Sequence, residues 1–438
     1  MKRLAAGALI LLGLFSPPAP ATSDPLPAPL EGQARRFVML TTALGHLRPA
    51  EIDAYWGPAD LDLRKKGGTA SLATLRHGLV QLRDDVARDA SSVRRDRLAE
   101  RLDHLIALLD VIERPRSLSF DQQAHRVYGL VAPPPGISGQ TRTLAKLDRL
   151  LPGHGDLTSR LAAWRARFVI PEQRRKAVFL RALAECRVRT LARWPLPPDE
   201  KLDVVWTTEV PAAWHRYRGH HHSLLQVNPA AIADPGSALD VACHEGYPGH
   251  HVQFLAMDAS AGPRGLAVED TVVILRSPDQ VLREGAANYG VDLAFPDSAR
   301  LAFTRDVLFP LAGFDRHQAA SFLQVHGAVG ELARSVLPIL RDYYDGRTAS
   351  GDAMARLILE AQVSSPEALL EYTRDTGAYV SGYTVARDVV AACINARTGQ
   401  GLDRWQALRE VVAAPDIAIL DVSDHSCATP HALQVRND

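Results

Sequence analysis

A proline and a glycine within a cluster of metal-ligand residues constrain this chain more than any other feature of its sequence. The cluster is His244-Glu245-Gly246-Tyr247-Pro248-Gly249-His250-His251. A hydrolytic zinc site needs three protein ligands and an open position for water, and its usual helical form places two histidines at positions i and i+4. Here the second histidine follows six or seven positions after the first. An unbroken helix would hold ligands so spaced about 10 Å apart along its axis, too far for one ion.

Pro248 and Gly249 remove this obstacle. Proline lacks a backbone N–H and would clash with the carbonyl of His244 if the helix continued, and glycine adopts backbone conformations that other residues avoid. We therefore expect the chain to leave the helix here and to bring His250 beside His244 as the second ligand. His251 stays open as an alternative ligand or as a residue that supports the ligands.

The base and the third ligand follow from the same chemistry. Glu245, one residue from a ligand, is expected to be the general base that orients the water. The downstream carboxylates that could complete the ligand set are Asp258, Glu269, Asp270, Asp279 and Glu284. Small residues after Glu284 would let a helix approach the ion, and Asn288 lies one turn further on the same face, where it can support a ligand. Spacing alone does not choose between Glu284 and Glu269.

Length and charge limit the domain organisation and the partners. The 438 residues are 46% apolar, and 50 basic residues balance 50 acidic ones. A chain of this size can bury a large core, and a neutral chain has no general attraction for nucleic acid or acidic membranes. We expect one mainly helical domain over residues 22–438, with an N-terminal lobe at about 30–195 and a metal-binding lobe at about 200–438. The sequence does not indicate the oligomeric state.

The N-terminus predicts export. A basic start, an apolar run over residues 5–15 and Ala19-Pro20-Ala21 fit a cleaved signal peptide over residues 1–21. The apolar run is too short to span a bilayer comfortably, so we expect a periplasmic or secreted protein without a membrane anchor after cleavage. Export permits disulfides. Cys243 is expected to be a small buried residue, and a bridge between Cys393 and Cys427 is conceivable but has no support from spacing.

Apolar periodicity predicts helices over most of the chain. Leucines recur at helical spacing from Leu98 behind an N-cap at Ser91 or Ser92. Further helices are expected at residues 171–194, 319–344, 365–374 and 379–396. Two short strands are expected at 202–210 and 223–228, separated by a loop that contains Arg216, Arg218 and His220-His221-His222.

The segment from His244 to Gln253 resembles the hallmark of the bacterial DUF885 family. That family carries a His-Glu-x-x-Pro-Gly-His-His-like motif and then a Glu-Gly-Trp-Ala-x-Tyr-like motif, which residues 284–289 match except for Ala286 in place of the Trp. The resemblance covers about residues 200–395. It implies a mainly α, gluzincin-like zinc-peptidase fold with a small β element bordering the active-site cleft. It also implies His244, His250 and Glu284 as ligands and Glu245 as base, and thus one zinc ion per chain. His251, Asn288 and Tyr289 are expected as supporting residues or alternative ligands.

Two other elements of the resemblance concern the substrate. Gln226-Val227-Asn228-Pro229 matches a strand that can pair with an extended peptide, which makes Gln226 and Asn228 expected substrate contacts. Ser381-Gly382-Tyr383 is a loose counterpart of a helical Ser-Tyr-x-x-Gly-like element. Tyr379 and Tyr383 would share one helical face, where either can donate a hydrogen bond to a tetrahedral oxyanion or simply pack between helices. His222 and Arg218 are alternative donors, although the three histidines also fit an exposed polar loop.

These expectations combine into an exported zinc-dependent hydrolase, in the first place a metallopeptidase acting on a peptide or small amide. One alternative is a non-catalytic metal-binding or scaffold protein, against which Glu245 argues, because a structural site needs no base and is usually closed by four protein ligands. The other alternative is a hydrolase of a non-peptide amide or ester.

Overall fold

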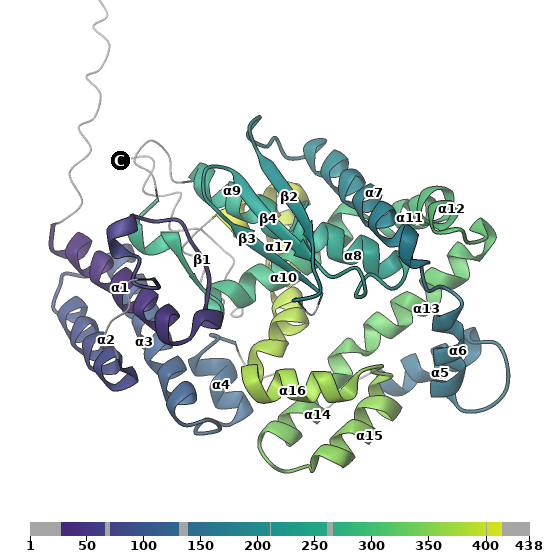
Figure 1. Ribbon diagram of the computed structural model, residues 1–438, viewed down its shortest axis with the longest axis horizontal. Coiled ribbons are helices and arrows are strands. Elements are labelled where there is room, and N and C mark those ends of the chain that lie inside the picture. Colours follow the sequence, from purple (N-terminus) through teal and green to yellow (C-terminus); the bar gives the residue numbers. More distant parts are fainter. Residues whose placement is uncertain are drawn as a thin grey trace, which may run out of the picture.

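The structure is a computed structural model that describes residues 28–65, 71–130, 139–210, 212–260, 266–399 and 401–413. The expected signal peptide, residues 1–21, lies outside these ranges. Within them the chain is mainly helical with two small sheets (Figure 1), which confirms the mainly helical character that was expected. None of the described helices combines the length and apolar character needed to cross a membrane.

The α-helices of the described residues are α1 (Ala28–Leu47), α2 (Leu72–Ala87), α3 (Val93–Glu113), α4 (Phe120–Arg126), α5 (Gln140–Leu150), α6 (Leu157–Ala166), α7 (Glu172–Leu191), α8 (Pro235–Glu245), α9 (His250–Ser260), α10 (Pro278–Ala294), α11 (Asp297–Phe303), α12 (Phe309–Ala312), α13 (Ala319–Glu331), α14 (Val336–Tyr344), α15 (Ser350–Ala361), α16 (Pro366–Thr376), α17 (Val385–Gly399) and α18 (Arg404–Ala413). Helices α1 to α3 lie at one end of the long axis, and α5, α6 and α11 to α13 lie toward the other end (Figure 1).

The strands form two separate sheets. Strand β1 (Ile52–Tyr55) pairs antiparallel with β5 (Val272–Ile274). The second sheet has the order β2-β4-β3, in which β4 (His222–Val227) is parallel to β2 (Lys201–Trp206) and antiparallel to β3 (Ala213–Tyr217). Strands β2 and β4 were expected. Strand β3 was not, because a loop was expected there, and its pattern becomes a strand only through pairing with β4.

The long helical patterns hold with local interruptions. Helix α3 begins after Ser92, whose side chain accepts from the N–H of Arg95, as an N-cap does. The pattern over residues 319–344 is broken by a 3-10 turn at residues 332–335. The segment expected as one helix from residue 379 instead begins with the 3-10 helix η8 (Gly377–Tyr383) and continues as α17.

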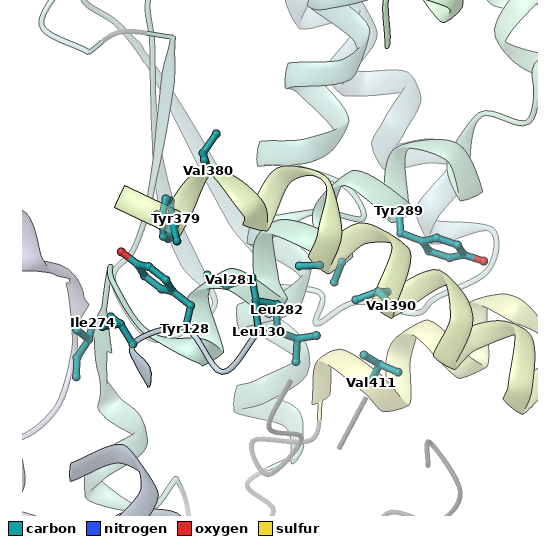
Figure 2. Packing of buried hydrophobic residues seen from close by; sticks show 14 of the residues in the cluster. Tyr128, Leu130, Ile274, Val281, Leu282, Tyr289, Tyr379, Val380, Val390 and Val411 are labelled. Atoms are coloured by element: carbon teal, nitrogen blue, oxygen red, sulfur yellow. The ribbon is translucent and has the colours of Figure 1, made fainter. Parts of the chain in front are cut away.

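One large core joins most of the helices. Figure 2 shows part of it, where Tyr128 and Tyr379 face each other from segments far apart in the chain. Their ring centroids are 5.8 Å apart in an edge-to-face arrangement, which aromatic rings favour. A smaller cluster, which includes Ala54, Tyr217 and Phe254, packs β1 and β3 against α9.

A disulfide between Cys186 and Cys243 joins α7 to α8. Cys243 is fully buried, as expected, but its bridge was not foreseen, because the two cysteines are 57 residues apart in the sequence. Cys427, one member of the pair considered from the sequence, lies outside the described residues.

Candidate metal centre

Helix α8 carries His244 and Glu245 on its last turn. It begins at Pro235 behind Asp234, whose carboxylate accepts from the N–H groups of Gly236 and Ser237. Proline at the first helical position and aspartate before it are both strong start signals. The helix ends at Glu245. If it continued, Pro248 would clash with the carbonyl of His244.

The chain leaves helix α8 and turns into α9 through Gly249. The Gly249 N–H donates to the carbonyl of Cys243 at 3.1 Å. A Cβ atom at this position would lie 1.7 Å from the carbonyl oxygen of His244, so no residue but glycine fits. Helix α9 then begins at His250, and the rings of His244 and His250 lie 4.7 Å apart between centroids.

Helix α10 brings Glu284 to the two histidines. It begins behind Ser277, whose hydroxyl accepts from the N–H of Gln280. Glu284 Oε2 lies 3.2 Å from Nε2 of His244 and 3.7 Å from Nε2 of His250. One ligand atom from each residue lies within 4.8 Å of the others, and they form the only such group of three among the described residues. The structure thus brings together the three residues that were expected as ligands.

Two amides fix how the histidines are protonated. His244 Nδ1 lies 3.0 Å from Oδ1 of Asn288, and His250 Nδ1 lies 3.4 Å from Oε1 of Gln253. Each amide nitrogen donates elsewhere, from Asn288 to the carbonyl of Tyr383 and from Gln253 to that of Arg283. The amide oxygens therefore face the imidazoles, so each Nδ1 is the protonated nitrogen and each Nε2 presents a lone pair.

The resulting donor set fits zinc. Oε2 of Glu284 is buried and has no hydrogen-bond partner among the described residues, while the lone pairs of two Nε2 atoms face it. Three electron-pair donors that face one another can hold a cation between them, and two imidazoles with one carboxylate are a ligand set of catalytic zinc. Burial would lower the pKa of His250, but the adjacent carboxylate of Glu284 raises it to about 9, so this position stabilises a positive charge.

Glu245 lies beside the ligands without a bond of its own. Its side chain is buried and makes no hydrogen bond or ion pair within the described part of the chain. Burial raises the pKa of its carboxyl group, an effect that the nearby His244 and His250 oppose and Glu284 reinforces. A carboxylate with a raised pKa and no partner can accept a proton from water.

His251 belongs to a different network. Its Nδ1 lies 2.8 Å from the hydroxyl of Ser223, and its Nε2 lies 2.8 Å from Glu200. Both ring nitrogens are therefore occupied. Glu200 also accepts from Arg187 and Tyr247. His251 therefore links the start of α9 to the β2-β4-β3 sheet and does not belong to the group of His244, His250 and Glu284.

The two tyrosines expected as oxyanion donors have hydroxyl groups with different partners. Tyr379 is buried and donates to Oε1 of Glu284 at 3.0 Å, whereas Tyr383 is 40% exposed and its hydroxyl lies 3.4 Å from that of Tyr372. They do not share a helical face, since residues i and i+4 lie about 120° apart around a 3-10 helix and about 40° apart around an α-helix. Burial of the Tyr383 hydroxyl raises its pKa, and the negative charge of Glu284 raises it further.

The expected substrate strand is not available for pairing. Strand β4 lies between β2 and β3, so both of its edges are already bonded, and an added strand would have to pair with β2 or β3. Gln226 stands in register with Trp214, on the face opposite Ser223, because side chains alternate along a strand. Asn228 bonds its own loop, donating to the carbonyl of Val210 and accepting from the N–H of Ala230.

Tyr289 does not reach the ligands. It lies five residues after Glu284 on α10, about 140° around the helix, whereas Asn288 lies about 40° away. Figure 2 shows its ring well apart from Tyr379.

The small residues of helix α10 have a different role from the one expected. A Cβ at Gly285 would lie 2.5 Å from the backbone carbonyl carbon of Ala386, so Gly285 allows α17 to pack closely against α10.

The other carboxylates considered as third ligand are engaged elsewhere. The pairs are Glu269 with Arg94, Asp270 with Arg97 and Arg101, Asp279 with Arg101, and Asp258 with the hydroxyl of Tyr217. His222, considered as an oxyanion donor, is bonded to Asp203 at 2.8 Å.

Asp53 and His215 belong to the site but were missed from the sequence. Asp53 on β1 accepts from Trp214 Nε1 at 2.6 Å. Burial raises the pKa of Asp53 to about 6, with the charges of Glu284 and Glu245 adding to this and Trp214 and His250 opposing it. The ring of His215 lies 6.0 Å from that of His250, and burial holds its pKa well below the usual range. Neither residue stands in a recognisable motif, and Asp53 lies far upstream of the ligands.

Comparisons with known proteins identify similar folds only. The crystal structure described as "the putative lipoprotein from Colwellia psychrerythraea" aligns with a TM-score of 0.50 and 14% identity over 91% of this chain and 74% of its own. A "putative lipoprotein of unknown function from Shewanella oneidensis" aligns with a TM-score of 0.48 and 13% identity over 83% of this chain and 74% of its own. No family model and no curated protein matches the sequence. At 14% identity the first likeness concerns the fold alone.

Proposed function

We propose that the chain is an exported zinc-dependent hydrolase of the DUF885 type with a gluzincin-like catalytic fold, and that its reaction is the hydrolysis of peptide bonds. His244, His250 and Glu284 are the zinc ligands, and Glu245 is the general base. One observation carries the proposal: three electron-pair donors, two of them on buried residues, face one another, and an unbonded carboxylate with a raised pKa lies next to them.

Each residue has a role that its surroundings support. A zinc ion held here would act as a Lewis acid and would lower the pKa of water toward ~7. Glu245 takes the proton from the attacking water and delivers it to the departing amine nitrogen as the C–N bond breaks. Tyr383 donates to the oxyanion, because its side chain is partly exposed and it lies close enough to Glu284 and Glu245 for their charges to affect it. Tyr379 holds Glu284 in place.

A non-catalytic scaffold role is disfavoured by Glu245. A structural zinc site is usually closed by a fourth protein ligand, and no fourth His, Cys, Asp or Glu joins the group within the described ranges. An unpartnered buried carboxylate would then only cost stability. In a hydrolase the same carboxylate is the proton acceptor that the reaction requires.

Metal analysis and one substitution test the proposal. Purified protein is expected to contain about one zinc per chain, and Glu245→Gln is expected to retain the zinc while losing ~10²-fold or more of peptide turnover. Glu209→Gln, an exposed glutamate on the loop after β2, is the matched control and should be unaffected. A folded protein without zinc would exclude the metal centre. Undiminished turnover in Glu245→Gln would exclude this base, and cleavage confined to esters in a mixed library would exclude peptides as the substrate.

A further inference from the structure

A cavity of about 300 Å³ lies between α6, α13, α14 and the segment that precedes α17. Much of its wall is apolar, formed by Val329, Ala333, Val336, Val363 and Val380. Val380 points away from Tyr379 and its core neighbours (Figure 2). A cavity of this size and lining fits a small apolar side chain.

Arg165 is the charged residue of this wall. It extends from α6 and donates from one terminal nitrogen to the carbonyl of Gln362 at 3.2 Å. Within the described residues it forms no ion pair, and burial lowers its pKa, with only the more distant Asp234 opposing this. A partly buried guanidinium without a carboxylate partner is costly and keeps most of its donors for an anion. Its planar geometry suits a carboxylate in particular.

Two other polar groups of the cavity also lack partners. The hydroxyl of Thr384 and Oε1 of Gln362 are buried and have no hydrogen-bond partner among the described residues, and both residues line the cavity. Gln362 is only 3% exposed. Since buried polar groups in folded proteins are nearly always bonded, these atoms indicate that the cavity is completed by a polar molecule.

Tyr383 connects the cavity to the metal centre. Its side chain is part of the cavity wall. Its carbonyl accepts from Asn288, which holds His244, and its ring lies 6.0 Å from that of Tyr379, which holds Glu284. A molecule seated in the cavity therefore lies beside the residue proposed to face the reacting carbonyl.

We propose that this cavity binds the C-terminal end of a peptide substrate, with the free carboxylate paired to Arg165 and a small apolar side chain packed against the valine-rich wall. The inference rests on the proposed peptidase function and narrows it to cleavage near a free C-terminus. Arg165 then determines specificity and takes no part in the bond-breaking step.

Binding to an inactive protein tests this directly. The probes are the tripeptide Ala-Ala-Val and its C-terminal amide, titrated calorimetrically into zinc-loaded Glu245→Gln protein. The free acid is expected to bind at least about tenfold more tightly than the amide, because a charge-assisted pair is lost in the amide. Adding Arg165→Gln should weaken binding of the free-acid peptide by a similar factor and leave binding of the amide unchanged. Arg167→Gln, an exposed arginine on the same turn, is the matched control and should change neither.

A second variant protects the test against a folding defect in Arg165→Gln. Ala333 is exposed and lines the cavity, so Ala333→Leu is expected to fold normally. The larger side chain should fill the apolar part of the cavity and weaken binding of both peptides at least about fivefold. Equal affinity of acid and amide in the parent protein would overturn the proposal, as would unchanged binding in Ala333→Leu. If the acid binds as expected but the wild-type protein does not cleave it, the subsite stands and the peptidase function fails.

Discussion

Tyr379 donates to Oε1 of Glu284 while Oε2 of the same carboxylate faces the two histidines. The tyrosine comes from η8 and the glutamate from α10, so the contact orients the proposed third ligand across two segments about a hundred residues apart. Substitution of a residue that orients a metal ligand in this way typically lowers metal affinity or activity by ~10- to 100-fold.

We expect Tyr379→Phe to weaken zinc binding by ~10- to 100-fold. The substitution removes one hydroxyl from a buried site and leaves Oε1 of Glu284 without its donor. Competition with a chromogenic chelator measures the affinity. A zinc affinity equal to that of the wild type would show that Tyr379 only packs in the core.

Tyr383→Phe is expected to have the opposite profile. Zinc affinity should be retained, while kcat should fall ~10²-fold, because an oxyanion donor acts mainly in the transition state. Steady-state kinetics on a cleavable peptide, together with the same chelator assay, distinguish the two tyrosines. An unchanged kcat would remove Tyr383 from the mechanism.

Gly249→Ala should destabilise the protein and disrupt the turn that brings His250 beside His244. The new Cβ would lie 1.7 Å from the carbonyl oxygen of His244, so the backbone must move, at a cost of about 3 kcal/mol. Thermal unfolding and zinc content measure both effects. The control is Gly327→Ala, exposed in the middle of α13 with no atom within 4 Å of the added Cβ, where a gain of about 0.5–1 kcal/mol is expected. A tolerated alanine at 249 would contradict this account of the turn.

Glu200 should contribute to stability in a defined pH range. Burial alone would raise its pKa, but bonds from His251, Arg187 and Tyr247 lower it from 4.5 to about 2. Since the folded-state pKa lies below the unfolded one, the stabilisation is present above pH ~4.5 and is lost as the pH falls toward ~2. The difference in free energy of unfolding between the wild type and Glu200→Gln should therefore shrink across this window. Denaturant titrations at several pH values measure it, and a constant difference would refute the assignment.

The Cys186–Cys243 bridge should stabilise the helix that carries the first ligand. It closes a loop of 57 residues, for which chain entropy predicts about 4 kcal/mol. The double substitution to alanine should lower the free energy of unfolding by about that amount, and zinc content should fall at temperatures where α8 loosens. Urea unfolding of oxidised wild type and the double variant provides the comparison, and equal stability would show that the bridge adds nothing.

The local sequence was sufficient to predict those features that depend only on residues close together in the chain. Ser92 starts α3 because its side chain caps the first turn. Pro171 likewise precedes α7, because its fixed backbone angle and missing N–H suit a helix start. Pro248 and Gly249 end α8 in the same way, so the choice of His250 over His251 could be made from the motif. The different partners of Tyr379 and Tyr383 could not be predicted from the sequence, because a 3-10 helix and an α-helix have similar local patterns.

The sequence by itself determined the mainly helical class, the break after Glu245 and the two histidines that meet across it, because steric exclusion by proline and glycine acts within a few residues. Only the tertiary structure decided the rest. It distinguished Glu284 from Glu269, paired His251 with Glu200 and placed Asp53 near the proposed ligands. It also left Arg165 without a carboxylate partner among the residues that the structure describes. Each of these depends on which distant segments pack together, and that packing is set by the sum of many weak contacts across the whole core.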